Sequence, residues 1–205
     1  MKIQLIGQNG KMGQILEELI NHDPKLTLDT KPEVIIDFSH PACLAKTLSF
    51  NKPTVIGTTG YSKEDYQKIN TQSQNRPILM SANFSLGIAL LKKMIAYTNK
   101  FLKGCDIDII EAHHKTKKDA PSGTALTLLQ TLEGKAKMHS IRAGQIVGEH
   151  KVLFSTDTES LTLEHVAHSR TVFAKGALLA AKFIVNKAPG LYSIDDLLES
   201  VSCEI

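Results

Sequence analysis

The sequence is poor in the residues that mark several protein classes. It has no tryptophan, and aromatic residues make up only 5% of its 205 positions. No uncharged stretch approaches membrane-spanning length, and the apolar run within Met1–Gly7 is too short for a signal peptide. The three cysteines, Cys43, Cys105 and Cys203, are far apart and form no CxxC pair, which argues against a disulfide framework or a zinc knuckle. We therefore expect a soluble protein of the reducing cytoplasm.

Charge of one sign is also lacking. The chain has 24 basic and 21 acidic residues, a formal net charge of +3. Such a balance indicates neither nucleic acid nor a membrane surface as partner, so any basic site must be local. With 42% hydrophobic residues the chain can bury one large or two small cores, which excludes disordered and fibrous proteins.

Hydrophobic patterning up to about Phe84 predicts strands that alternate with helices. Short apolar runs are typical of buried strands, and segments with helical spacing or helix-compatible polarity lie between them. The predicted strands are 3–6, 34–37, 54–57 and 78–81. This alternation predicts a parallel sheet, as in a Rossmann-like nucleotide-binding domain.

The pattern after Phe84 is different. It predicts a long helix, a strand, a helix capped by Ser122, three strands with short connections typical of antiparallel pairing, and another helix. The predicted ranges are 86–102, 106–112, 122–132, 139–143, 150–155, 161–166 and 170–185. The fold class is therefore α/β, with the nucleotide-binding half followed by an α+β half of about a hundred residues.

Gly7–Gly13 reads Gly-Gln-Asn-Gly-Lys-Met-Gly and joins the first strand to a helix. Glycines let backbone N–H groups approach a pyrophosphate at the helix N-terminus, and a sharp strand–helix connection without a ligand is the alternative. Asp29, about 20 positions further on, is the candidate ribose ligand, with a solvated loop carboxylate as the alternative. The neighbouring Lys31 is suited to a 2′-phosphate, so the choice between NADH and NADPH stays open. Gly57–Gly60 and Ser81–Phe84 also follow strands and should converge on the cofactor.

Glu111–Thr124 is the segment of the chain richest in side chains that can transfer protons or bind an anion. Five of the six residues in His113–Lys118 are basic, and they precede a helix that starts at Ser122-Gly123-Thr124. Backbone N–H groups and hydroxyls there suit a carboxylate, and the His/Lys side chains can move protons. The alternative interpretation of this basic cluster is a solvent-exposed charged face without a ligand. A metal site is disfavoured because adjacent histidines in a strand point to opposite faces, and nucleic acid because aromatic residues are not interleaved.

Together these motifs resemble the 4-hydroxy-tetrahydrodipicolinate reductase (dihydrodipicolinate reductase) family of the bacterial diaminopimelate and lysine pathway. The resemblance runs nearly end to end, and Glu111–Thr124 is its most specific part. It is carried by Gly7–Gly13, Ile36–Ser39, Gly57–Gly60, Asn83–Gly87, Glu111–Thr124, Arg142–Gly144, Gly148–His150 and Ser169–Ala174.

The resemblance implies reduction of the cyclic product of pyruvate and aspartate semialdehyde, a small dicarboxylate, with NADPH or NADH and with loss of water. It implies that His113 and Lys117 are the catalytic proton-transfer residues and that His114, Ser122, Gly123 and Thr124 bind substrate. Arg142 and Arg170 are open between anion binding and structural ion pairs. The predicted cofactor-binding residues are Gly7, Gln8, Asn9, Gly10, Lys11, Met12, Asp29, Gly57, Thr58, Thr59, Ser81, Ala82, Asn83 and Phe84.

The resemblance further implies a homotetramer whose second domain has an open mixed sheet. It predicts a nucleotide-binding domain of residues 1–84 and 190–205 and a substrate and tetramerisation domain of residues 85–189. The chain departs from longer members in having only about a dozen residues between Asn21 and Val34. Two alternatives stay open. One is another two-domain nicotinamide-dependent reductase or dehydrogenase of a small acid, and the other, suggested by this shortening, is a catalytically silent nucleotide sensor.

Overall fold

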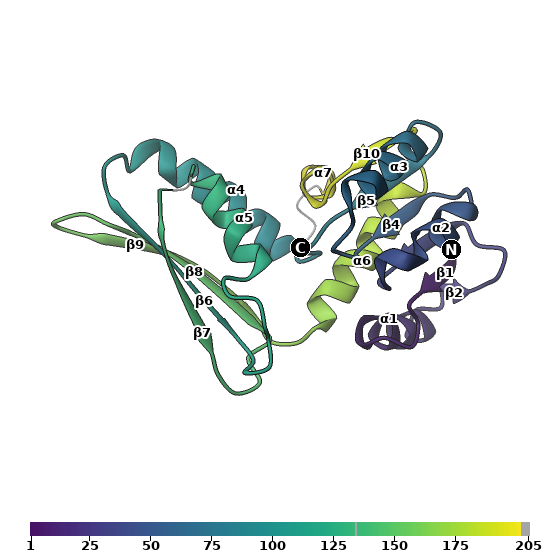
Figure 1. The fold of residues 1–205 in the computed structure, drawn as a ribbon, viewed down its shortest axis with the longest axis horizontal. Coiled ribbons are helices and arrows are strands. Elements are labelled where there is room, and N and C mark those ends of the chain that lie inside the picture. Colours follow the sequence, from purple (N-terminus) through teal and green to yellow (C-terminus); the bar gives the residue numbers. More distant parts are fainter. Residues whose placement is uncertain (134, 202–205) are drawn as a thin grey trace. The chain divides into compact units, whose positions relative to one another are not determined.

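The computed structural model describes residues 1–133 and 135–201, and the chain in it divides into two compact units. Unit 1 contains Met1–Ser85 and the segment from Thr171 onward, and unit 2 contains Leu86–Arg170 (Figure 1). Cys203 lies outside the described residues. Within the described ranges, no helix has both the length and the apolar character needed to cross a membrane.

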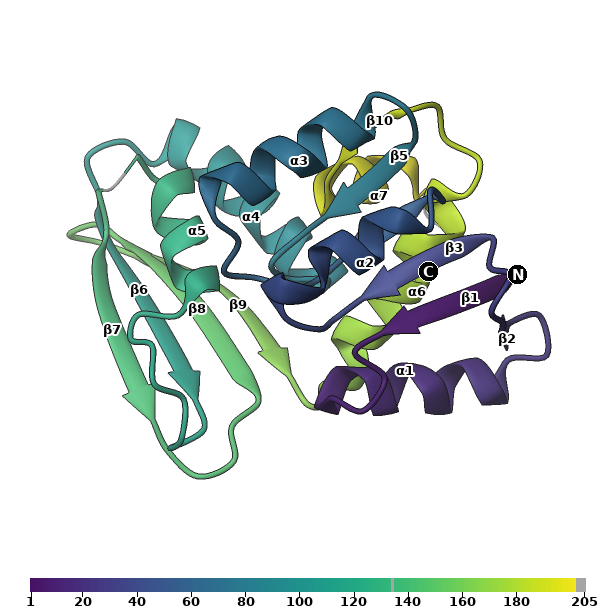
Figure 2. The ribbon, with the colours of Figure 1, turned by 45° about the vertical axis from the view of Figure 1, so that its right-hand side comes forward.

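Unit 1 is built on a parallel sheet with the strand order β10-β5-β4-β3-β1-β2. Its strands are β1 (Lys2–Ile6), β2 (Thr27–Leu28), β3 (Val34–Asp37), β4 (Thr54–Ile56), β5 (Pro77–Met80) and β10 (Gly190–Tyr192). Its helices are α1 (Lys11–His22), the 3-10 turn η1 (Pro41–Cys43), α2 (Leu44–Ser49), α3 (Lys63–Ser73), α6 (Thr171–Ile184) and α7 (Ile194–Ser200). Figure 2 shows α2 and α3 on one side of this sheet and α1 and α6 on the other. The Rossmann-like fold is thus confirmed.

Helix α6 corrects the predicted domain boundary. The sequence placed the helix at 170–185 in the second domain, whereas α6 belongs to unit 1 and packs on β3, β4 and β5. Its small residues permit this close approach: a Cβ at Gly176 would lie 1.8 Å from the carbonyl oxygen of Phe84. A helical pattern reveals that a face is apolar but not which sheet it covers, so the sequence could not assign the helix.

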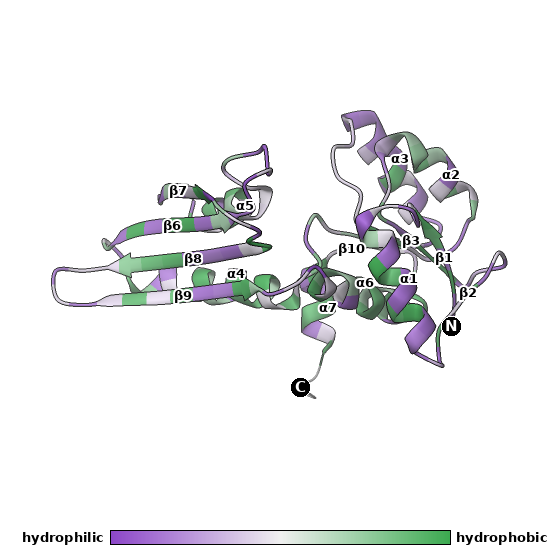
Figure 3. Ribbon diagram, turned by 90° about the horizontal axis from the view of Figure 1, so that it is seen from below, coloured by the Kyte–Doolittle hydropathy of each residue, from purple (hydrophilic) through white to green (hydrophobic). Residues whose placement is uncertain are grey.

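Unit 2 is a mixed sheet with the strand order β7-β6-β8-β9, covered on one face by α4 (Leu86–Phe101) and α5 (Gly123–Thr131). Its strands are β6 (Asp106–His113), β7 (Lys137–Arg142), β8 (Gly148–Ser155) and β9 (Ser160–Ala167). Figure 3 shows hydrophilic and hydrophobic residues interspersed along β6, whereas β8 is hydrophilic along its first half and hydrophobic along its second. The prediction of antiparallel pairing holds for β8 and β9 but is wrong for β7, which runs parallel to β6 because α5 forms a crossover between them.

Candidate active site

The inner face of the unit 2 sheet changes from apolar to titratable along β6. Ile107 and Ile109 point into the core beneath α4 and α5. Glu111 and His113 continue on the same face, because side chains two residues apart on a strand share a face. Both are buried, with 1% and 8% of their surface exposed. The strand period therefore places an acid and an imidazole side by side at the end of the core.

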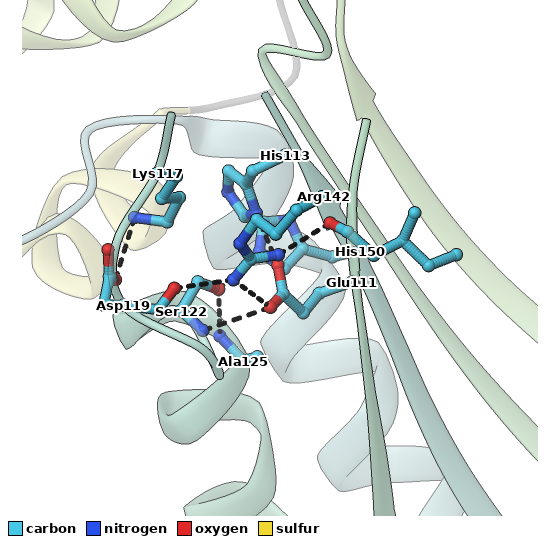
Figure 4. Close-up of polar contacts among 9 residues, drawn as sticks. Glu111, His113, Lys117, Asp119, Ser122, Ala125, Arg142 and His150 are labelled. Carbon is cyan, nitrogen blue, oxygen red and sulfur yellow. Dashed lines mark hydrogen bonds and ion pairs between the residues drawn. The ribbon is translucent and has the colours of Figure 1, made fainter. Parts of the chain in front are cut away.

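Glu111 is the centre of the polar network in Figure 4. Its Oε2 lies 2.5 Å from Nδ1 of His113, and its Oε1 lies 2.6 Å from a guanidinium nitrogen of Arg142. The backbone N–H of Ser122 also donates to Oε1, at 3.3 Å. Arg142 in addition donates to the carbonyl oxygen of Asp119, at 2.6 Å. Arg142 therefore serves as a structural ion-pair partner, which was one of the two alternatives for it.

These contacts set the protonation of the pair. Burial by itself would raise the pKa of Glu111, but hydrogen bonds from Arg142, Ser140 and His113 lower it to about 2. Burial also lowers the pKa of His113 below its usual value, although Glu111 opposes this shift. At neutral pH an ionised Glu111 thus accepts the Nδ1 proton of a neutral His113, which leaves Nε2 as the ring's basic atom. Gly148 lies beside that atom, since a Cβ there would be 3.2 Å from Nε2.

The other cationic residues lie in the loop that follows β6. Nζ of Lys117 is 2.8 Å from Oδ2 of Asp119, and its positive charge contributes to lowering the pKa of His113. His114 turns away from His113, and its Nδ1 lies 2.8 Å from the hydroxyl of Thr116. The structure therefore brings Lys117 into the electrostatic surroundings of His113 and leaves His114 at the surface of the loop.

The loop ends at the N-terminus of α5. Ser122 caps this helix, since its Oγ accepts a hydrogen bond from the backbone N–H of Ala125 at 3.2 Å. Gly123 is exposed, and a Cβ built on it meets nothing within 4 Å. The first turn of α5 thus offers backbone donors and partial positive charge to an anion. Figure 4 places Ser122 close to Glu111 and Arg142, so this turn adjoins the Glu111–His113 pair.

In unit 1 the predicted phosphate turn is a tight glycine turn between β1 and α1. Gly7 has a φ of +88°, and a Cβ on it would lie 2.4 Å from the carbonyl oxygen of Phe38. A Cβ on Gly13 would lie 2.2 Å from the carbonyl oxygen of Gly7. Among the described residues no side chain caps α1 at Gly10, whereas Ser62 caps α3. Gly7 and Gly13 are both needed for the tight turn itself, and a helix N-terminus without a capping side chain is suited to bind a dinucleotide phosphate through its backbone N–H groups.

Strand register gathers the predicted cofactor loops at one edge of the sheet. Ile6 pairs with Asp37, Asp37 with Ile56, and Ile56 with Met80, so the residues that follow all leave the same edge. These following residues begin the segments Gly7–Met12, Gly57–Thr59 and Ser81–Phe84. Ligands of parallel sheets bind at this carboxyl edge, so the convergence agrees with the predicted site.

Asp37, part of the Ile36–Ser39 motif, stabilises part of this edge. It is fully buried and accepts hydrogen bonds from the hydroxyls of Ser39 at 2.5 Å, Thr47 at 2.5 Å and Thr58 at 2.9 Å. These bonds tie the loops after β3 and β4 together. A lone aspartate at a strand end gives no sequence signal for such a role, which depends on Thr47 and Thr58, 10 and 21 residues away, as well as on the nearby Ser39.

Asp29 does not join the other predicted residues. β2 pairs only with the start of β1, and the N–H of Asp29 donates to the carbonyl oxygen of Ile3. Gly7 is four residues beyond Ile3, or about 13 Å along an extended strand. The Asp29 carboxylate instead pairs with Nζ of Lys2 at 3.1 Å and accepts from the N–H of Lys31. Register therefore places Asp29 beside the first half of β1 and not at its carboxyl end.

A Rossmann-like unit with a phosphate turn, joined to a mixed-sheet unit with a His–carboxylate pair, defines a two-domain oxidoreductase of the pyridine-nucleotide class. The family model "Dihydrodipicolinate reductase, N-terminus" matches residues 26–84, and "Dihydrodipicolinate reductase, C-terminus" matches residues 87–198. The chain therefore belongs to the dihydrodipicolinate reductase family.

Individual relatives agree over nearly the whole chain. The 4-hydroxy-tetrahydrodipicolinate reductase of Alkaliphilus oremlandii is 39% identical, covering 97% of this chain and 98% of the relative. That of Thermosipho africanus is 40% identical with the same coverage of both chains. The solved structure of a dipicolinate-bound dihydrodipicolinate reductase from Paenisporosarcina sp. TG-14 has a TM-score of 0.82 at 22% identity, covering 96% of this chain and 98% of that one.

Proposed function

We propose that this protein reduces 4-hydroxy-tetrahydrodipicolinate to tetrahydrodipicolinate, with loss of water, using NADPH or NADH. The observation that carries the proposal is the buried Glu111–His113 pair beside the open N-terminus of α5. That combination offers proton transfer and carboxylate binding within one short stretch of structure. The curated relatives bear the name of this reductase, and the related solved structure holds dipicolinate, a dicarboxylate.

In this proposal the first turn of α5 binds a substrate carboxylate through the backbone N–H groups of Gly123 and Thr124 and through Ser122. Hydride addition to an unsaturated imine leaves an enamine that needs a proton. Lys117 is the cation that donates this proton. His113, held in one tautomer by Glu111, accepts or relays a proton at Nε2. His114 contacts the substrate from the surface of the loop.

When bound, the nicotinamide cofactor supplies the hydride. Gly7–Met12, Gly57–Thr59 and Ser81–Phe84 hold it at the carboxyl edge of the unit 1 sheet. We leave Asp29 out of this set because of its register. Backbone N–H groups of the phosphate turn would contact the pyrophosphate that both cofactors share, so this turn does not discriminate between NADH and NADPH.

We also propose that the protein is a homotetramer of the cytoplasm. The face of the unit 2 sheet opposite α4 and α5 exposes Ile141 and Val166, at 48% and 39%. Exposed apolar residues on a sheet face indicate association between chains. Light scattering behind size-exclusion chromatography measures the oligomer, and a monomer at micromolar concentration would contradict it.

The test of the reaction follows nicotinamide absorbance while a condensing enzyme generates substrate from pyruvate and aspartate semialdehyde. NADH and NADPH are offered separately. Oxidation that depends on both precursors supports the proposed reductase. Nucleotide binding without oxidation would replace it by a reductase of another acid or by a silent nucleotide sensor.

A further inference from the structure

His150 on β8 is buried in the candidate site but has no part in the proposed reaction. Only 3% of its surface is exposed. Register places it opposite Glu111 across β6 and β8, and opposite His165 across β8 and β9. It therefore belongs to the titratable end of the inner sheet face, next to the Glu111–His113 pair.

Two contacts define its position. Its Nε2 lies 3.3 Å from the hydroxyl oxygen of Ser122. Its ring packs edge-to-face against His113, with centroids 5.2 Å apart and planes at 78° (Figure 4). Its Nδ1 is buried and has no hydrogen-bond partner among the described residues. Burial lowers the pKa of His150 to about 4, so the ring is neutral at physiological pH and carries one proton.

That single proton can sit on either nitrogen, and the surroundings distinguish the two. On Nδ1 it would form a buried N–H without an acceptor, an arrangement that native proteins largely avoid. On Nε2 it is donated to the Ser122 hydroxyl oxygen. That oxygen already accepts the backbone N–H of Ala125. With both acceptor positions of the hydroxyl occupied, its own proton remains available for donation.

We infer that His150 is a positioning residue that, by donating from Nε2, makes the Ser122 hydroxyl a hydrogen-bond donor to a carboxylate bound at the N-terminus of α5. The inference rests on the proposed function and names a determinant of substrate affinity within it. Hydrogen bonds to charged groups are stronger than those between neutral groups, so a donor that is correctly aimed contributes measurably to dicarboxylate binding.

The first test reads the tautomer in the unaltered protein. Nitrogen chemical shifts of 15N-histidine-labelled protein, assigned with the His150→Gln variant, show which ring nitrogen carries the proton. We expect the Nε2–H form. The Nδ1–H form would overturn the inference, whatever the activity of the protein.

The second test compares two variants of His150, one that keeps the aromatic ring and one that keeps the hydrogen-bond donor. His150→Phe keeps an aromatic ring against His113 but removes the donor, whereas His150→Gln keeps an N–H donor near Nε2 without the ring. With pyridine-2,6-dicarboxylate as calorimetric probe, we expect His150→Phe to raise Kd about tenfold. We expect KM to rise similarly and kcat to stay within about threefold. His150→Gln should bind within about threefold of the unaltered protein.

His139→Gln, on the opposite face of the same sheet, is the matched control and should leave both constants unchanged. If His150→Phe binds the probe as tightly as the unaltered protein, or His150→Gln loses as much affinity as His150→Phe, the inference is wrong. A failure of the proposed reaction is distinct, because the unaltered protein would then fail to oxidise NADPH or NADH with substrate while the tautomer measurement remained informative.

Discussion

Replacing Glu111 by glutamine tests the buried pair at the centre of the site. Glutamine has the shape of a protonated glutamate, so the variant measures what ionisation at this position contributes. The pKa of Glu111 falls from 4.5 to about 2 on folding. Since each pKa unit corresponds to about 1.36 kcal/mol, ionised Glu111 stabilises the fold at neutral pH by about 3 kcal/mol. Glu111→Gln should therefore lower the free energy of unfolding by about that amount.

The pH dependence of stability independently tests whether ionisation of Glu111 stabilises the fold. A carboxyl group with a depressed folded-state pKa contributes its full stability above its unfolded pKa, here 4.5, and loses it as the pH falls towards about 2. The difference between the unaltered protein and Glu111→Gln should thus shrink from about 3 kcal/mol at pH 7 to about 1.4 kcal/mol at pH 3. Urea unfolding at the two pH values measures this difference.

The same variant should also reduce turnover. An amide can donate to Nδ1 of His113 as well as accept from it, so the imidazole is no longer held in one tautomer. Loss of a positioned acid–base group costs about 10²- to 10⁴-fold, and we expect at least a hundredfold loss of kcat.

Asp108→Asn is the matched control, because Asp108 pairs with His139 at 2.6 Å on the exposed face of the same strand. Exposed pairs contribute about 0 to 1 kcal/mol, and this one is remote from the reaction. If Glu111→Gln were as stable as Asp108→Asn and turned over within threefold of the unaltered protein, the assignment of Glu111 as an ionised positioning residue would be refuted.

Four further variants test other parts of the molecule. His113→Ala and Lys117→Ala should each lower kcat at least a hundredfold with NADPH affinity unchanged in fluorescence titration, and full activity in either would remove its catalytic role. Gly13→Ala, whose Cβ would lie 2.2 Å from the Gly7 carbonyl oxygen, should abolish NADPH binding but leave dicarboxylate binding to unit 2 measurable by calorimetry. Asp29→Asn should leave the ratio of NADH to NADPH affinities within twofold, and a larger shift would show that Asp29 reaches the ribose.

At the carboxyl edge of the unit 1 sheet, some features can be predicted from the sequence and others cannot. Gly7, Gly10 and Gly13 indicate a phosphate turn because their spacing reflects what the backbone itself needs, a tight turn and close approach to a pyrophosphate. Asp29 has the expected spacing as well, yet it lies elsewhere because β2 pairs with only the first residues of β1. Spacing along the chain therefore indicates the turn, whereas the position of Asp29 relative to β1 depends on strand register.

The candidate active site divides in the same way. The sequence by itself determined the strand that carries Glu111 and the helix that starts at Ser122, since both follow from local periodicity and capping. The structure extends that strand to His113, so that Glu111 and His113 share one face. The tertiary structure alone decided that Arg142 and His150, from two other strands, complete the network. It also decided that α6 packs in unit 1. Local preferences act within a few residues, whereas register and packing are set by contacts between segments far apart in the chain.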